Sequence, residues 1–130
     1  MRTLIVEDDF LARTILSTLL SDYGTCHLVI DGSEAVAAIE KAYDKGEQYD
    51  LVCLDIMMPV MNGQEALSAI RKNEDARGIA IEDRVNVIMV TALDDEDNRK
   101  KAEEMGCKAY LTKPLEGEKV VSLLKDLELI

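Results

Sequence analysis

Three aspartates follow short apolar runs in the chain, and together they could bind a cation. Asp8 and Asp9 follow the run 4–6 after one intervening residue, and Asp55 comes directly after the run 51–54. If these runs are neighbouring strands of an open parallel sheet, the carboxylates meet in one crevice beyond the strand ends, where such sheets bind ligands. Carboxylates this close repel one another, so either their pKa values rise or a cation enters. Mg²⁺ suits a site that supplies a few oxygen ligands and leaves positions for water and phosphate.

Two more polar side chains are predicted at the same edge of the sheet. The apolar run 85–91 ends in Thr91, and the run 109–112 is followed by Lys113. A phosphoryl group on Asp55 would need a cation, an ammonium group to pair with one oxygen and a hydroxyl to bond another. Each residue alone has an ordinary explanation as a strand end or a helix cap. Their joint occurrence favours a phosphoryl-accepting site. Pro114 makes a cis peptide accessible after Lys113.

Apolar runs alternate with amphipathic stretches five times along the chain. The predicted strands cover residues 4–6, 26–30, 51–54, 85–91 and 109–112, and helices are predicted near 11–23, 32–46, 62–73, 95–105 and from 116 onward. Near-continuous apolarity in short runs is typical of strands buried on both faces of a parallel sheet. The order therefore predicts an α/β fold with right-handed crossovers and helices on both faces. The long polar connection 72–84 has no assigned role.

The fourth predicted helix differs from the others in its composition. Only Ala102 and Met105 are clearly apolar in the stretch 95–105, while acidic residues crowd its start and basic residues follow. A helix with so narrow an apolar stripe gains little from burial, so we expect it to be the most mobile of the five.

Length and composition limit the class of protein. The chain has 130 residues, 48% of them hydrophobic, and a formal net charge of −11, which is typical of one compact acidic domain. Such a surface disfavours direct binding to nucleic acid or anionic lipid. Three dispersed cysteines favour reduced thiols, and neither a signal peptide nor a membrane span is predicted. We therefore expect a cytoplasmic domain covering residues 1–130, with no attached effector domain.

Taken together, these residues resemble the receiver domain of two-component response regulators, especially the single-domain chemotaxis type. The resemblance spans the whole chain and rests on four strings, which are Val6-Glu7-Asp8-Asp9, Asp55-Ile56-Met57-Met58-Pro59 with Gly63, Val90-Thr91-Ala92, and Tyr110-Leu111-Thr112-Lys113-Pro114. It implies a flavodoxin-like (βα)5 fold, a doubly wound five-stranded parallel sheet with strand order 2-1-3-4-5.

The resemblance also implies roles for the residues of the site. Asp55 corresponds to the phosphoryl acceptor, which takes its group from a phosphohistidine or a small phosphodonor. Asp8 and Asp9 correspond to the acidic pair that holds Mg²⁺, with Mn²⁺ as a substitute, together with Asp55 and the backbone carbonyl of Met57. In the same family pattern, Lys113 pairs with the phosphoryl group.

The resemblance further implies a switch and a set of partners. Thr91 corresponds to the switch hydroxyl and Tyr110 to the aromatic side chain that reports the state. The fourth helix, fifth strand and fifth helix are then the output surface for a downstream protein.

The phosphoryl group comes from a sensor histidine kinase or a phosphotransfer protein. Neither nucleic acid nor membrane insertion is expected, and the chain is expected to be a monomer or a weak phosphorylation-dependent dimer. It acts as a signalling protein that catalyses only its own phosphorylation and dephosphorylation on aspartate.

Met57 and Leu93, two residues after Asp55 and Thr91, have apolar side chains that cannot orient a water by hydrogen bonding. Slow intrinsic dephosphorylation is therefore predicted, with a phosphatase as a further partner.

Three alternatives remain from the sequence. The first is a receiver-fold interaction module that works without phosphorylation. The second is an aspartyl-phosphate hydrolase of the haloacid-dehalogenase type, but Met57 stands where a second Asp is usual. The third is a flavodoxin, but the acidic residues 7–9 stand where its phosphate loop would be.

Overall fold

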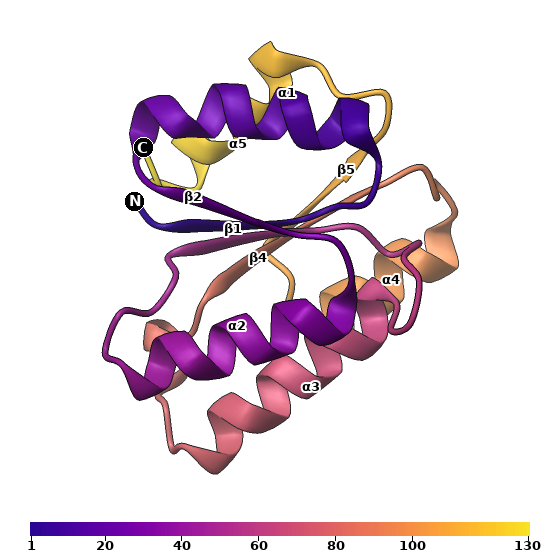
Figure 1. Ribbon diagram of the computed structural model, residues 1–130. Coiled ribbons are helices and arrows are strands. Elements are labelled where there is room, and N and C mark those ends of the chain that lie inside the picture. The colour runs from indigo at the N-terminus through magenta and orange to yellow at the C-terminus, as the bar shows by residue number, and fades with distance from the viewer.

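The computed structural model describes residues 1–130 and alternates strand and helix five times along the chain (Figure 1). The strands are β1 (Thr3–Val6), β2 (Cys26–Val29), β3 (Leu51–Leu54), β4 (Asn86–Thr91) and β5 (Ala109–Thr112). The helices are α1 (Phe10–Leu20), α2 (Gly32–Asp44), α3 (Gly63–Ala76), α4 (Glu96–Glu104) and α5 (Gly117–Asp126), with short 3₁₀ turns at Ser21–Tyr23 and Ile81–Asp83. None of the helices has both the length and the apolarity that a membrane span requires.

The five strands form one parallel sheet in the order β2-β1-β3-β4-β5, which confirms the predicted fold class. Val6 of β1 pairs with Leu54 of β3, Leu54 pairs with Met89 of β4, and Thr91 pairs with Thr112 of β5. The predicted site residues therefore follow strands that end close together, at one edge of the sheet.

Helices cover both faces of the sheet and enclose two apolar clusters. In Figure 1, α1 and α5 lie above the sheet, and α2, α3 and α4 lie below it. The β1 and β3 strands are buried along their whole length, as their apolar runs predicted. The larger cluster packs α2 and α3 against one face, and the smaller one packs α1 and α5 against the other.

Side-chain caps mark the starts of α2 and α3. The side chain of Asp31 accepts a hydrogen bond from the backbone N–H of Glu34 at the start of α2. Asn62 and Glu65 form a reciprocal capping box at the start of α3. The next residue, Gly63, packs against the backbone carbonyl of Asp55, since a Cβ at Gly63 would lie 2.1 Å from that oxygen. The start of α3 is thus held directly against the residue that follows β3.

The connection 72–84 is more ordered than its polarity indicated. The α3 helix continues beyond the predicted end near Asn73 to Ala76. The reason is Glu74, whose side chain is fully buried and accepts hydrogen bonds from the Tyr43 hydroxyl and the Val85 backbone N–H. Arg71 pairs with the same carboxylate at 2.7 Å. A charge that is buried and fully paired ties α3 to α2 and to the segment leading into β4.

We predict that Gly63→Ala destabilises the protein by on the order of 2 kcal/mol, because its methyl group would meet the backbone of Asp55 and not a flexible side chain. Gly117→Ala is the matched control, since its Cβ would make only ordinary contacts with Leu19 at 3.5 Å. Urea denaturation of both variants measures the difference. Equal stability of the two variants would show that the approach of α3 to Asp55 is not constrained.

Candidate functional site

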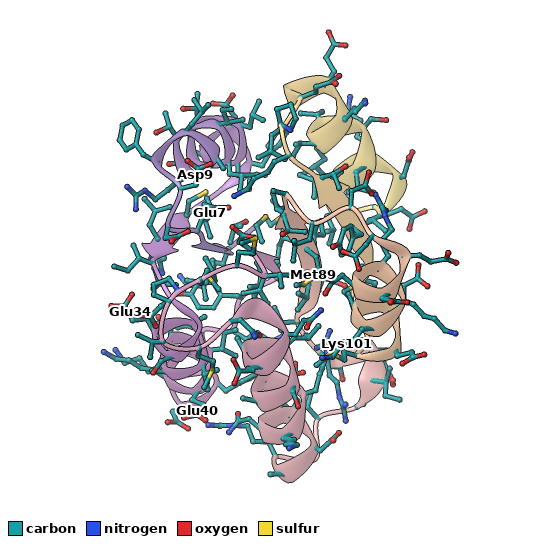
Figure 2. All side chains as sticks on the ribbon, turned by 90° about the vertical axis from the view of Figure 1, so that its right-hand side faces the viewer. Glu7, Asp9, Glu34, Glu40, Met89 and Lys101 are labelled. Carbon is teal, nitrogen blue, oxygen red and sulfur yellow. The ribbon has the colours of Figure 1, made fainter.

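The carboxyl ends of the strands bring four polar side chains to one edge of the sheet. Glu7 follows β1, Asp55 follows β3, Thr91 ends β4 and Lys113 follows β5. The backbone ladder continues into the site, because the Asp55 N–H donates to the carbonyl of Val6 at 3.1 Å and the Lys113 N–H donates to the carbonyl of Thr91 at 2.8 Å. Figure 2 shows this edge, with Glu7 and Asp9 beside the start of α1.

Lys113 forms ion pairs with two buried carboxylates. Its Nζ lies 2.9 Å from Oδ2 of Asp55 and 2.9 Å from Oε1 of Glu7. Burial of the lysine favours its neutral form, but the hydrogen bonds to Asp55 and Glu7 outweigh this effect and raise the pKa of Lys113. The peptide bond between Lys113 and Pro114 is cis, a form that a following proline allows.

Glu7 is the site residue that sequence reasoning missed. Its side chain is fully buried, and burial raises its pKa from 4.5 to about 7, against the lowering effect of its hydrogen bond with Lys113. The oxygen Oε2 of Glu7 is buried and has no hydrogen-bond partner. A signal was present in the sequence, since Glu7 directly follows the fully buried strand β1 and therefore still lies at the sheet edge.

The carboxylates that converge differ from the predicted set, because Glu7 takes the place expected for Asp9. Oxygens of Glu7, Asp8 and Asp55 all lie within 4.8 Å of one another. Asp9 is instead the N-cap of α1 and accepts a hydrogen bond from the Leu11 backbone N–H at 3.3 Å. The reason is that β1 ends at Val6, so the chain has already turned into the helix by Asp9. Asp9 stays near the site through Oδ2, which lies 3.7 Å from Nζ of Lys113.

The second oxygen of Asp55 is held by the backbone of the following loop. Met57 donates its N–H to Oδ1 of Asp55 at 3.2 Å, while Lys113 binds Oδ2. The side chain of Met57 points outward and is 58% exposed. It lines a groove of about 640 Å³ beside the site, together with Asp8 and Leu93. One side of the acidic cluster is thus open to a molecule approaching over an apolar surface.

Thr91 and Tyr110 both bond to the loop after β4. The buried Thr91 hydroxyl accepts a hydrogen bond from the Leu93 N–H at 3.3 Å. The Tyr110 hydroxyl donates to the Leu93 carbonyl at 2.6 Å, and the Arg99 guanidinium lies over the Tyr110 ring at 4.7 Å. Leu93 therefore connects the end of β4 to Tyr110, and the Tyr110 ring in turn contacts Arg99 of α4.

The oxygens of the cluster fit a hard divalent cation. Three carboxylates converge here, and the unpartnered Oε2 of Glu7 leaves an acceptor with lone pairs to spare. Lys113 neutralises only part of this charge. Cations such as Mg²⁺ and Mn²⁺ prefer oxygen ligands of this kind, so the residues present are compatible with the predicted metal.

Two other residues whose side chains could do chemistry have structural roles. Cys53 is buried, and burial raises the pKa of its thiol to about 12, so it carries no thiolate at neutral pH. His27 lies on β2, where its Nδ1 is 2.6 Å from the Tyr49 hydroxyl.

Comparison with known proteins points to one family. The family model for the response regulator receiver domain matches residues 3–125. The chemotaxis protein CheY of Halobacterium salinarum is 30% identical over 127 residues, which cover 96% of this chain and 94% of that protein. The hybrid signal transduction histidine kinase G of Dictyostelium discoideum is 38% identical over 133 residues, which span all of this chain but only 3% of that protein. The chain likewise spans 12% of probable histidine kinase 2 from rice.

Solved structures of similar fold point to the same family. A CheX–CheY–BeF₃–Mg²⁺ complex from Borrelia burgdorferi contains a chain with a TM-score of 0.81 and 29% identity, covering 98% of this chain and 89% of that one. The chemotaxis protein CheY4 of Vibrio cholerae has a TM-score of 0.78 and 25% identity, with 96% of each chain covered.

We predict that the buried Glu7 makes stability depend on pH in metal-free solution. Its pKa is higher in the folded protein than in the unfolded chain, so the folded state holds the proton more tightly between pH 4.5 and about 7. Stability should therefore fall as pH rises through this window. Glu7→Gln removes the effect and should be more stable than the unmodified chain at pH 8 by on the order of 2 kcal/mol, with no difference near pH 4.

Urea denaturation in the presence of a chelator measures this pH profile. Glu82→Gln, at an exposed carboxylate, is the control and should keep the profile of the unmodified chain. Parallel profiles for the chain with Glu7 and the chain with Gln at this position would contradict the prediction.

Proposed function

Because the chain belongs to the response regulator receiver domain family, we propose that Asp55 accepts a phosphoryl group and that its modification controls binding of a downstream protein. Such domains are signalling proteins of two-component systems. The observation that carries the proposal is the pairing of buried Asp55 Oδ2 with Lys113 Nζ at 2.9 Å, beside two further carboxylates. The family match favours this function over the dehalogenase-type hydrolase and the flavodoxin.

In the proposed reaction, a carboxylate oxygen of Asp55 attacks phosphorus. The bond between phosphorus and a histidine nitrogen breaks as the oxygen–phosphorus bond forms, and the electron pair stays on the nitrogen, which takes a proton. The Met57 N–H and the Lys113 ammonium hold separate oxygens of Asp55, so the carboxylate is oriented before the donor arrives. Lys113 is then placed to pair with a phosphoryl oxygen.

Glu7, Asp8 and Asp55 are the residues proposed to hold Mg²⁺, with the backbone carbonyl of Met57 as a further oxygen. The bound ion supplies charge neutralisation for the phosphoryl oxygens. We assign Asp9 to the start of α1 and not to the metal, because its side chain caps that helix.

Thr91 and Tyr110 are proposed to transmit the modification. A phosphoryl group beside β4 offers acceptor oxygens, and a hydrogen bond from the Thr91 hydroxyl to such a charged acceptor contributes about 1.5–3 kcal/mol. This bond requires Thr91 to turn away from its present contact with the Leu93 N–H. Because Tyr110 bonds to the carbonyl of the same Leu93, a shift of this loop changes the surface formed by α4, β5 and α5.

We propose that this surface binds the downstream protein and that a sensor histidine kinase or a phosphotransfer protein supplies the phosphoryl group. The surface carries charges of both signs, including Arg99 and Asp94, so binding should weaken at high salt. We further propose that the domain functions in the cytoplasm, which is supported by its three free cysteines.

The proposal predicts that acetyl phosphate with Mg²⁺ labels the chain on Asp55. Asp55→Asn should abolish the label, because an amide has no nucleophilic carboxylate oxygen. Asp50→Asn is the control, since Asp50 lies before β3 at the opposite end of that strand. Phosphate-affinity electrophoresis and intact mass measure the adduct. Labelling that persists in Asp55→Asn, or that fails in the unmodified chain, would refute the proposed function.

The exposed Met57 side chain predicts a long-lived aspartyl phosphate, since it cannot orient an attacking water. Met57→Asn places an amide at this position and should shorten the lifetime by roughly threefold to tenfold, the effect of about one hydrogen bond in the transition state. Val60→Asn is the control, because Val60 is 86% exposed in the same loop and its positive φ of 68° tolerates Asn. Decay of the ³²P label gives both rates. An unchanged lifetime in Met57→Asn would contradict the explanation.

A further inference from the structure

The helix α4 is attached to the protein by very little apolar surface. Only Ala102 of its nine residues is buried. A groove of about 430 Å³ separates α4 from α3, and Lys101 of α4 and Met105, just after α4, line it opposite Ser68 and Lys72 of α3. Figure 2 shows Lys101 on the side of α4 that faces α3. Apolar packing therefore constrains the position of α4 only weakly, and polar contacts must contribute to it.

One polar contact holds the first turn of α4. The side-chain amide of Gln64 on α3 donates to Oδ1 of Asn98 on α4 at 2.7 Å. Gln64 is only 9% exposed, so water competes poorly for this bond. Asn98 in turn donates through its own amide to Oδ1 of Asp95, the N-cap of α4, at 2.7 Å. The bond therefore links α3 to the residue that starts α4.

Gln64 directly follows Gly63, the residue of α3 that packs against the backbone of Asp55. The preceding Gly63 donates its N–H to the carbonyl of Ile56 at 2.9 Å, and its α-carbon packs against the Asp55 carbonyl without space for a methyl group. A displacement of the Asp55 loop therefore moves the first turn of α3, and with it the Gln64 amide.

A second contact from α3 holds the other end of α4. Arg71 donates to the carbonyl of Gly106, just beyond α4, at 2.9 Å. Arg71 cannot move freely, because it also pairs with the fully buried Glu74 and donates to the carbonyl of Val85 at 3.0 Å. The end of α4 near Gly106 is thus anchored to a rigid network, while the end near Asn98 is joined to α3 by one neutral hydrogen bond and to β5 by the contact of Arg99 with the Tyr110 ring.

We propose that the Gln64–Asn98 hydrogen bond is a latch that keeps α4 in its resting position, and that α4 turns about the Arg71–Gly106 contact when the latch opens. This inference rests on the proposed function in one respect, since it assigns the opening to modification of Asp55. Gln64 is accordingly a positioning residue that acts through Asn98.

The structure indicates which state the latch favours. Thr91 is bonded to the Leu93 N–H, and Lys113 is bonded to both Asp55 and Glu7, so both side chains are engaged without a phosphoryl group. The latch is closed in this arrangement. Removing it should therefore lower the cost of reaching the modified state.

Hydrogen exchange on the unphosphorylated chain tests the latch without any phosphoryl chemistry. Gln64→Ala should accelerate exchange in α4 by roughly fivefold, the change that loss of one neutral hydrogen bond produces, and leave exchange at Gly106 unchanged. Asn98→Ala should accelerate exchange at least as much, because it also removes the Asn98 bond to Asp95. The double variant should match Asn98→Ala, because the bond between the helices is already lost in that variant. Asn73→Ala is the matched control, an α3 amide that bonds to Glu40 of α2 instead of α4.

Titration with beryllofluoride and Mg²⁺ tests the link to Asp55. Gln64→Ala should bind this phosphoryl mimic roughly threefold to fivefold more tightly than the unmodified chain, and Asn73→Ala should bind it equally. Unchanged exchange in α4, effects of Gln64→Ala and Asn98→Ala that simply add, or unchanged affinity for the mimic would each overturn the latch. If the unmodified chain does not bind the mimic while exchange in α4 responds as expected, the proposed function has failed and the contact between the helices stands.

Discussion

A lysine held between two buried carboxylates is the interaction on which the site depends. Buried charges are tolerated only when they are paired, and Lys113 pairs with both Asp55 and Glu7. One ammonium group cannot balance these two carboxylates and the nearby Asp8, so the pocket retains excess negative charge and an unpartnered oxygen. This imbalance prepares the pocket for a cation. In the proposed function, a bound cation lets the same pocket accept a phosphoryl group that the carboxylates alone would repel.

The parallel sheet explains how residues from distant parts of the chain share this pocket. All five strands run in the same direction, so the residues that follow β1, β3 and β5 emerge at one edge, in a register set by the backbone ladder. The sheet is rigid because β1 and β3 are buried on both faces. The buried core therefore holds the site side chains at the strand ends in place. The helices that follow the strands differ in how much apolar surface attaches them to this core.

This difference is greatest between α3 and α4. The first turn of α3 packs against the Asp55 backbone, and its last turn is held by the buried Glu74. The neighbouring α4 has one buried residue and depends on side chains that α3 presents to it. The proposed modification of Asp55 thus has two proposed routes to α4, one through Thr91 and the loop after β4, the other through the start of α3. Both act on the least firmly attached helix, which borders the proposed output surface.

The sequence by itself determined the element order, the buried strands and the assignment of Asp55, Thr91 and Lys113 to strand ends, because periodicity and apolar runs are local properties of the chain. It could not decide which acidic residues converge. That depends on the residue at which β1 ends and α1 begins, and this boundary placed Glu7 in the cluster and Asp9 at the helix cap. It also gave no sign that Glu74 is buried or that Gln64 meets Asn98, since these contacts join residues 11 to 34 positions apart. Tertiary packing removes these polar groups from water. Once they are buried, each needs a hydrogen-bond partner, and that partner determines how the neighbouring elements are held.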